Sequence, residues 1–180
     1  MALMLNVMRR YPQADAFVRT GKWTAPNTFP PATSLGGKTV GILGLGGIGL
    51  AVARRSVCFG MDVRYHNRNR RNVDYPYDPD TVTLARNSDV LVLAVPGGPQ
   101  TGKMVNRAVL DALGPRGYLI NTARGSVVDE PVLIEYLQQK KIAGAGLDTF
   151  ENEPRIDRRL IELDNVVLYP HVGTYTVETR

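Results

Sequence analysis

From Lys38 onward, short apolar or β-branched runs alternate with longer amphipathic segments. Apolar runs this short are typical of strands buried on both faces of a parallel sheet. The runs predict strands at 39–43, 62–66, 90–95, 118–121, 143–147 and 166–169. The segments between them predict helices at 48–59, 106–113, 129–140 and 157–163, with a weaker one at 81–86. Regular alternation of strand and helix predicts a doubly wound α/β fold, with helices on both faces of one twisted sheet.

The first 37 residues follow a different pattern. Apolar side chains recur there at helical spacing, at Leu3, Met4, Val7 and Met8. Pro12 is expected to mark a bend, after which helical character resumes. The next stretch contains several prolines and few periodic apolar residues. We therefore expect a leading helix over 1–20 and an arm over 21–37, followed by the Rossmann-type core over 38–170.

Gly44, Gly46 and Gly49 form a G-x-G-x-x-G pattern between a predicted strand and a predicted helix. In that context the first glycine permits a tight turn and the second lets the backbone approach a pyrophosphate. The third lets the helix pack closely on the strand. The helix N-terminus adds unpaired amides and a partial positive charge. The pattern predicts a dinucleotide-binding loop.

The residues after the second predicted strand indicate which dinucleotide is preferred. An NAD site usually has Asp or Glu about 20 residues beyond the glycines, bonded to the adenosine ribose. This chain has Asn67, Arg68 and Arg70 in that region instead. An amide and two guanidinium groups suit a 2′-phosphate, which a carboxylate would repel. We predict NADP over NAD; the alternative is that the arginines are only solvated loop residues.

Three further residues, Arg124, Glu153 and His171, each follow a predicted strand, where open α/β sheets bind their ligands. Histidine changes charge near neutral pH and can deliver a proton, with a carboxylate as its partner. Arginine grips planar anions through two donors. Together they suit the reduction of a 2-oxo acid, although each residue alone also fits an ordinary surface role. Asp148, closer to its strand end, is a candidate contact for the nicotinamide carboxamide.

Composition narrows the class of protein. With 180 residues, 43% hydrophobic and 22% charged, the chain fits one ordinary globular domain. The net charge is +5, but the basic cluster around residues 64–71 lacks the interleaved aromatic residues of a nucleic-acid surface. No apolar stretch is long enough to cross a bilayer, so we expect a cytoplasmic protein.

The single cysteine, Cys58, lies in an apolar helical pattern and is expected to be a small buried side chain. With only His66 and His171 besides it, a zinc site built from Cys and His is not expected. We predict no metal.

Four motifs occur in order: residues 44–49, Asn121-Thr122-Ala123-Arg124-Gly125, residues 146–154, and Pro170-His171-Val172-Gly173. Over nearly its whole length the chain resembles the D-isomer-specific 2-hydroxyacid dehydrogenase family, in particular its glyoxylate and hydroxypyruvate reductase branch. The resemblance implies an NAD(P)-dependent oxidoreductase that reduces a small 2-oxo acid. It also implies Arg124 as the substrate-binding residue, Glu153 as the acid partner and His171 as the proton donor.

The resemblance further places Thr101 near the cofactor, Val95-Pro96 at the adenosine side and Asp148 near the nicotinamide. The full set of expected cofactor contacts is Gly44, Gly46, Gly47, Ile48, Gly49, Asn67, Arg68, Arg70, Val95, Pro96, Thr101, Thr122, Ala123, Arg124, Asp148, His171 and Gly173. It also implies a homodimer built largely from this domain. The apolar stripe of Leu3, Met4, Val7 and Met8 is then expected to be an interface.

The chain also departs from the family pattern. The resemblance implies that residues 1–180 lack most of the family's substrate domain, so they are expected to form a single dinucleotide-binding domain, with 171–180 starting the return to a substrate domain. A site left open to water loses electrostatic preorganisation, so we expect cofactor binding with feeble turnover. Thr174-Tyr175-Thr176 replaces the smaller residues common in the family.

Two other functions remain as alternatives. The same family includes corepressors that sense a bound dinucleotide, and the proline-containing arm suits such a binding protein. A short-chain dehydrogenase would need Tyr-x-x-x-Lys; Tyr136 and Lys140 have that spacing but lie in a predicted amphipathic helix, away from the expected nicotinamide position.

Overall fold

The computed structural model describes residues 1–179. Six strands form one sheet in the order β2-β1-β3-β4-β5-β6, and every neighbouring pair is parallel. The strands are β1 (Thr39–Leu43), β2 (Asp62–His66), β3 (Val90–Leu93), β4 (Tyr118–Asn121), β5 (Gly144–Leu147) and β6 (Val166–Leu168). This confirms the doubly wound α/β fold. The predicted third strand, 90–95, ends two residues early, shortly before Pro96.

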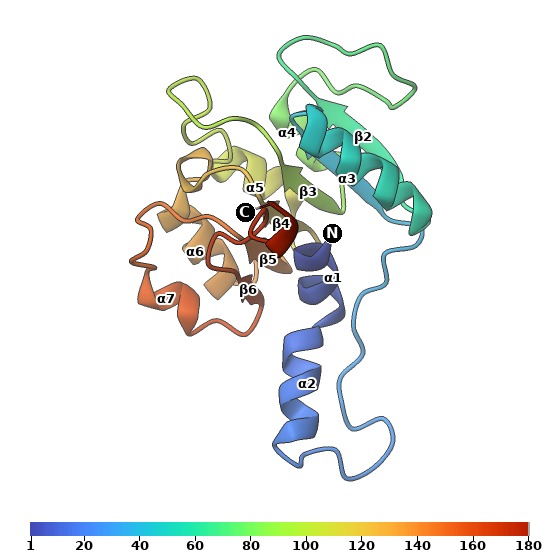
Figure 1. The fold of residues 1–180 in the computed structure, drawn as a ribbon, viewed down its shortest axis with the longest axis vertical. Helices are drawn as coiled ribbons and strands as arrows, with labels where there is room; N and C mark the ends of the chain where they lie inside the picture. The colour runs from blue at the N-terminus through green and yellow to red at the C-terminus, as the bar shows by residue number, and fades with distance from the viewer. Residues whose placement is uncertain (180) are drawn as a thin grey trace.

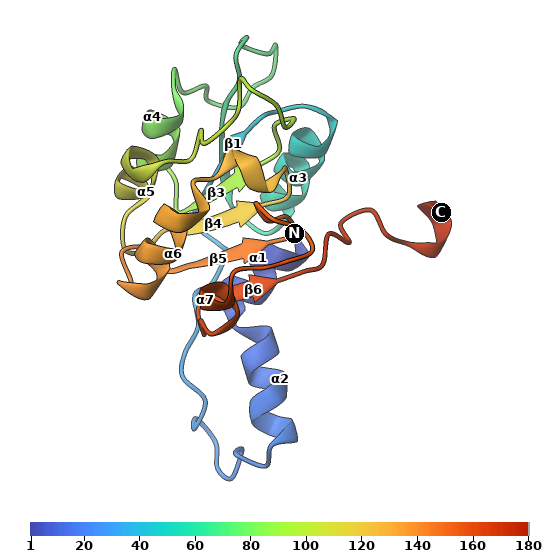
Figure 2. The ribbon, with the colours of Figure 1, turned by 90° about the vertical axis from the view of Figure 1, so that its left-hand side faces the viewer.

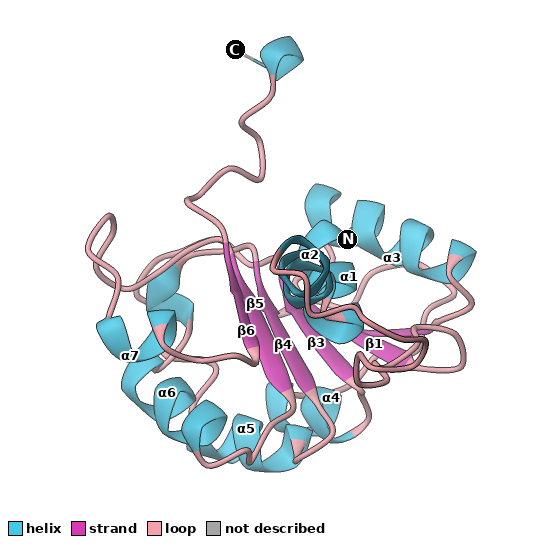
Figure 3. Cartoon of the chain, turned by 90° about the horizontal axis from the view of Figure 1, so that it is seen from below, coloured by secondary structure: helices cyan, strands magenta, loops and turns pink. Residues whose placement is uncertain are grey.

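The helices that flank the sheet are α3 (Gly47–Cys58), α4 (Thr81–Arg86), α5 (Arg107–Leu113), α6 (Glu130–Gln138) and α7 (Arg158–Ile161). Short 3₁₀ turns lie at Gly125–Val127 and Val177–Thr179. Helices α4 to α7 cover one face of the sheet and α3 the other, as Figure 3 shows. Within the strands, buried residues alternate between two apolar clusters, one on each face. The sheet is therefore the middle of three layers, and its edge of strand ends is free for a site.

The segment before the sheet forms two helices, α1 (Ala2–Arg9) and α2 (Tyr11–Arg19), and not one bent helix over 1–20. The break lies at Arg10, whose φ of 54° is left-handed, so the α1 ladder ends there. Pro12 lies in the first turn of α2, where a missing N–H costs no hydrogen bond. Helix α2 projects from the body, and the chain returns beside it (Figure 1).

Helix α1 packs against β5 on the face that also carries α3. A Cβ added at Gly144 would lie 3.0 Å from the Val7 side chain, and one at Gly146 would lie 3.1 Å from Leu3. The two glycines therefore let the helix approach the strand closely. The four stripe residues, Leu3, Met4, Val7 and Met8, are at most 6% exposed. The hypothesis that they form an interface between copies is wrong, because the chain's own sheet covers them.

Cys58 is exposed, so the prediction that it is buried is also wrong. The buried face of α3 consists of Gly49, Ala53 and Ser56. Cys58 comes two residues after Ser56, which places it about 200° further around a helix of 3.6 residues per turn. Its side chain therefore points to solvent despite its apolar neighbours in sequence.

After β6 the chain leaves the sheet; residues 171–173 still contact the body through Glu153 and Asp148, and the last stretch before the C-terminus projects away from it (Figure 2). Arg180, the last residue of the predicted return segment, lies outside the described residues. Within residues 1–179, no helix is long and apolar enough to span a membrane.

Candidate active site

The order of strands in the sheet reverses beside β1, because the chain passes from β1 to β2 on one side and places β3 on the other. Open α/β sheets bind ligands in the crevice at the carboxyl ends of such strands. Two cavities open along this edge. The β2-side cavity, of about 490 Å³, is lined by residues that end or follow β1, β2 and β3. The β4-side cavity, of about 620 Å³, is lined by Ile48 and by the loops after β3 and β4.

The glycine loop after β1 is shaped by two close backbone contacts. Gly44 has φ of +98°, and a Cβ added there would lie 2.8 Å from the carbonyl of Ala94. A Cβ at Gly49 would lie 2.1 Å from the carbonyl oxygen of Gly44. Both positions therefore require glycine.

Gly46 and Gly47, in contrast, have nothing within 4 Å of an added Cβ. Among residues 1–179, no side chain caps the N-terminus of α3, which begins at Gly47. Amides of the first helical turn lack intrahelical acceptors and attract anions. The open space and the uncapped helix end fit the pyrophosphate of a dinucleotide.

The loop after β2 borders the β2-side cavity. Asn67 and Arg68 line it, and so does Arg71, which the sequence argument did not select. The Asn67 Oδ1 atom accepts the Leu45 N–H at 2.6 Å, and Arg68 Nη1 donates to Gln100 Oε1 at 3.0 Å. Arg70 is not among the lining residues; its guanidinium lies over the Tyr77 ring, 5.7 Å from the centroid.

The His171 imidazole meets the Glu153 carboxylate, with 2.8 Å between Nδ1 and Oε2. The two residues are brought together because β5 and β6, which precede them, are neighbours in the sheet. An ionised carboxylate can only accept hydrogen bonds, so Nδ1 is the donor. Nε2 is then the ring nitrogen left to face a substrate. Both side chains are partly exposed, at 44% for His171 and 34% for Glu153.

Burial, hydrogen bonds and nearby charges together set the pKa of Glu153. Burial alone would raise its pKa, but hydrogen bonds from His171 and from the Phe150 N–H lower it, and the nearby charge of Arg124 adds to the lowering. The Phe150 N–H donates to Oε1 at 2.9 Å. The net effect is a Glu153 pKa below its ordinary value. The partner of His171 is therefore a carboxylate at neutral pH.

Asp148, 4% exposed, holds the turn that carries His171. Its two carboxylate oxygens accept the N–H groups of Val172 and Gly173, each at 2.9 Å. His171 itself has φ of 54°, in the left-handed region that non-glycine residues seldom adopt. The contacts from Asp148 help to maintain that conformation. Its expected contact with a nicotinamide stays a prediction.

Glu130, at the start of α6, holds the loop after β5 that carries Glu153, and sequence reasoning missed it. Its Oε2 accepts the Glu151 N–H at 3.0 Å, and its side chain is 7% exposed. Burial, the largest influence, raises its pKa. Gly125 packs against the same loop, since a Cβ there would lie 1.9 Å from the Phe150 carbonyl. In the sequence, an acid at a helix start indicates only a favourable helix end.

Arg124 follows β4 and lines the β4-side cavity with Thr122 and Ala123. The Asn121 side chain fixes its turn by accepting the Ala123 N–H and donating to the Arg124 carbonyl. The Arg124 side chain runs beside Gly97, and Nη1 donates to the Ala123 carbonyl at 2.6 Å. The residue is exposed, so its guanidinium can reach a ligand at this edge.

The family description for the NAD-binding domain of D-isomer-specific 2-hydroxyacid dehydrogenases matches residues 1–173. This chain belongs to that family. Among curated dehydrogenase relatives, a hydroxyphenylpyruvate reductase of Plectranthus scutellarioides is 50% identical over 99% of the chain. A glyoxylate/hydroxypyruvate reductase of Arabidopsis thaliana is 48% identical over 99% of the chain. The chain spans 57% of the length of each.

A solved dehydrogenase structure matches the fold closely. It is an NADPH-dependent glyoxylate/hydroxypyruvate reductase of Sinorhizobium meliloti in complex with NADP and malonate. The TM-score is 0.95 at 48% identity, covering 99% of this chain and 56% of that one. The similarity therefore includes the whole sheet and the edge that carries the candidate site.

Most expected contacts of this dehydrogenase domain lie at the edge of the two cavities. The β2-side cavity is lined by Gly44, Gly46, Asn67, Arg68, Val95, Pro96 and Thr101, and the β4-side cavity by Ile48, Val95, Pro96, Thr122, Ala123 and Arg124. Thr101 donates from Oγ1 to the Pro96 carbonyl at 2.8 Å. Tyr136, 1% exposed, donates instead to Asp111 of α5, so the alternative pair with Lys140 does not suit a nicotinamide site.

Proposed function

We propose that this chain is the cofactor-binding part of an NADP-preferring reductase of small 2-oxo acids such as glyoxylate or hydroxypyruvate. The observation that carries the proposal is the bond between His171 and Glu153 at the same sheet edge as the glycine loop. The reductase names of the relatives support it over the nucleotide-sensing alternative.

A bound reduced nicotinamide would supply a hydride to the substrate's carbonyl carbon. As negative charge grows on the carbonyl oxygen, His171, protonated at both ring nitrogens, donates its Nε2 proton and becomes neutral. Glu153 accepts the hydrogen bond from Nδ1 and so keeps that proton and the orientation of the ring in place. Arg124 binds the substrate carboxylate through its guanidinium and polarises the adjacent carbonyl.

The preference for NADP rests on the charge at the β2-side cavity. Arg68 and Arg71 line it together with Asn67. At the position where an NAD site has Asp or Glu bonded to the ribose, this sequence has Asn67 and Arg68 instead. The Sinorhizobium relative, described as NADPH-dependent, supports the same choice. Titration of the chain with NADPH and with NADH should give clearly tighter binding of NADPH. Equal dissociation constants would contradict the preference.

Turnover tests the catalytic roles. We expect the chain to oxidise NADPH slowly with glyoxylate or hydroxypyruvate, because the reductases it resembles are considerably longer. His171→Gln should lower that rate by roughly 10²- to 10⁴-fold, the range for a lost general acid. NADPH affinity, measured in parallel, should fall far less than the rate. An unchanged rate in the variant would rule out His171 as the proton donor.

Assembly and location are further parts of the proposal. A homodimer is supported by the apolar side chains that α2 and the arm expose, Tyr11, Val18 and Trp23. A monomeric mass in solution would contradict it. A cytoplasmic location fits a reaction that draws on reduced dinucleotide, and cell fractionation would test it.

A further inference from the structure

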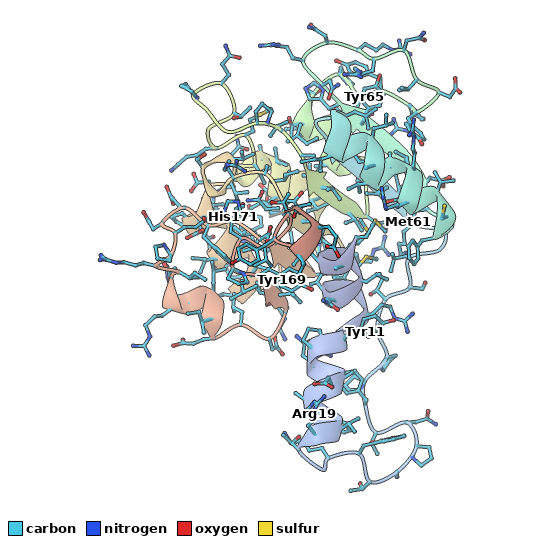
Figure 4. The ribbon with its side chains drawn as sticks, viewed as in Figure 1. Tyr11, Arg19, Met61, Tyr65, Tyr169 and His171 are labelled. Carbon is cyan, nitrogen blue, oxygen red and sulfur yellow. The ribbon has the colours of Figure 1, made fainter. Side chains whose placement is uncertain are left out.

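The basic loop after β2 is tied to a buried tyrosine hydroxyl. Tyr65 lies in β2 and is 0% exposed. Its hydroxyl accepts the Arg71 N–H at 2.9 Å and donates to the Arg71 carbonyl at 3.0 Å. One side chain therefore fixes both polar groups of the Arg71 backbone, six residues further along the chain. Figure 4 labels Tyr65 near the top of the view, well separated from His171.

Tyr65 is itself held by backbone hydrogen bonds and by a ring contact. Its backbone bonds the segment after the loop, with its N–H donating to Pro76 and its carbonyl accepting from Asp78. Its ring contacts the Tyr77 ring edge-on, with 5.4 Å between centroids. The Tyr77 hydroxyl in turn donates to the Asn67 carbonyl at 3.2 Å. The two tyrosines thus hold both ends of the loop, Tyr77 at Asn67 and Tyr65 at Arg71.

This support explains why two adjacent arginines have different positions. Arg71, whose backbone is fixed, lines the β2-side cavity with Arg68. Arg70, one residue earlier, stacks on Tyr77 instead. Pre-ordering a cation in this way lowers the entropic cost of binding an anion. A guanidinium suits a phosphate because it offers a planar fork of donors.

We propose that Tyr65 is a positioning residue that sets the preference for NADPH over NADH by holding Arg71 at the 2′-phosphate. The inference rests on the proposed function and extends it to a buried residue that is not among those lining the β2-side cavity. Without the hydroxyl, Arg71 keeps its charge but loses its fixed backbone. The preference should then weaken, while the interactions that NADPH and NADH share at the glycine loop should persist.

Tyr65→Phe removes the hydroxyl and keeps the packed ring. We expect NADPH affinity to fall about 5- to 10-fold, the order expected when one hydrogen bond to a charged ligand is weakened. NADH affinity should remain near wild type. Tyr118→Phe is the matched control, since its hydroxyl bonds Thr33 and not the loop. Equal losses for both cofactors would indicate a purely structural role and overturn the proposal.

A double-mutant cycle with Arg71→Ala tests whether Tyr65 acts through Arg71. In the Arg71→Ala background, Tyr65→Phe should cause little further loss of NADPH affinity; a full additional loss would overturn the proposal. If Tyr65→Phe does not fold, Arg71→Ala alone should still reduce the NADPH preference more than Arg70→Ala does, and the reverse order would overturn it. A wild-type chain that binds both cofactors equally would refute the proposed cofactor choice, whereas a selective wild type with an equally selective Tyr65→Phe would refute this inference alone.

Discussion

The two ends of the sheet edge hold their loops by different chemistry. At the β2 end, backbone contacts and neutral hydroxyls position the glycine loop and the basic loop, as Tyr65 does for Arg71. At the β5–β6 end, the carboxylates of Asp148, Glu130 and Glu153 accept backbone N–H groups of the loops that follow β5 and β6. Each end carries a different part of the proposed reaction.

The difference separates cofactor binding from catalysis in their response to acid. Tyrosine hydroxyls remain neutral at the pH values where carboxylates take up protons. As the pH falls through the lowered pKa of Glu153, the loop that Glu153 holds should loosen, while the bonds between the Tyr65 hydroxyl and the Arg71 backbone should persist. Substitutions at the two ends should also affect different quantities, stability and turnover at one and cofactor affinity at the other.

Gly125→Ala should have the largest effect, at the β5–β6 end. The added Cβ would lie 1.9 Å from the Phe150 carbonyl and 2.4 Å from the Glu151 nitrogen, so the backbone must shift. Overpacking of this kind typically costs about 1–3 kcal/mol. We expect a lower melting temperature and a large loss of turnover, because Phe150 also binds the carboxylate of Glu153. Thermal denaturation and an NADPH oxidation assay would measure both effects.

Gly46→Ala is the matched change at the other end. An added Cβ there meets nothing within 4 Å, so the unliganded chain should keep its melting temperature. The methyl would occupy the approach to a pyrophosphate, and affinity for NADPH and NADH should fall together, on the order of tenfold or about 1.4 kcal/mol. If Gly46→Ala melts early, or Gly125→Ala keeps full activity, the two ends are not independent in the way described.

At the β2 end, the sequence located the glycine loop but did not identify which of Arg70 and Arg71 lines the cavity. The glycine spacing located the loop correctly, because Gly44 and Gly49 of the G-x-G-x-x-G pattern meet a backbone requirement that only glycine satisfies. The sequence argument selected Arg70, whereas Arg71 is the one that lines the cavity, because their positions depend on bonds from Tyr65 and Tyr77, which lie outside the loop. Adjacent basic residues give no signal of which one turns toward a cavity.

At the β5–β6 end, the sequence identified the pair of His171 and Glu153, because residues after neighbouring parallel strands meet at one edge. It did not identify Glu130, which acts through a backbone N–H 21 residues away. The prediction that Leu3 and Val7 form an interface was wrong for a similar reason. An apolar helical stripe has the same pattern whether the chain's own sheet or another copy covers it.

Glu153→Gln tests the charge at the catalytic end. The folded-state pKa of Glu153 lies below the ordinary 4.5, so its ionised form stabilises the folded chain above that pH. This stabilisation is lost as the pH falls through the lowered pKa. Wild type should therefore melt at a higher temperature than Glu153→Gln near neutral pH, and the difference should shrink in acid below 4.5. A difference that stays constant with pH would show that the charge contributes nothing.

Glu130→Gln should have the smallest effect, with the opposite sign. Burial raises the Glu130 pKa above 4.5, so ionising Glu130 destabilises the folded chain. This destabilisation is absent below pH 4.5 and develops as the pH rises through the raised pKa. Glutamine removes the charge and can still accept the Glu151 N–H. The variant should melt slightly higher than wild type near neutral pH and equally in acid, with NADPH affinity unchanged. Glu162→Gln, at an exposed position, is the control. A lower melting temperature for Glu130→Gln at neutral pH would mean that the charge strengthens the bond to Glu151 by more than its burial costs.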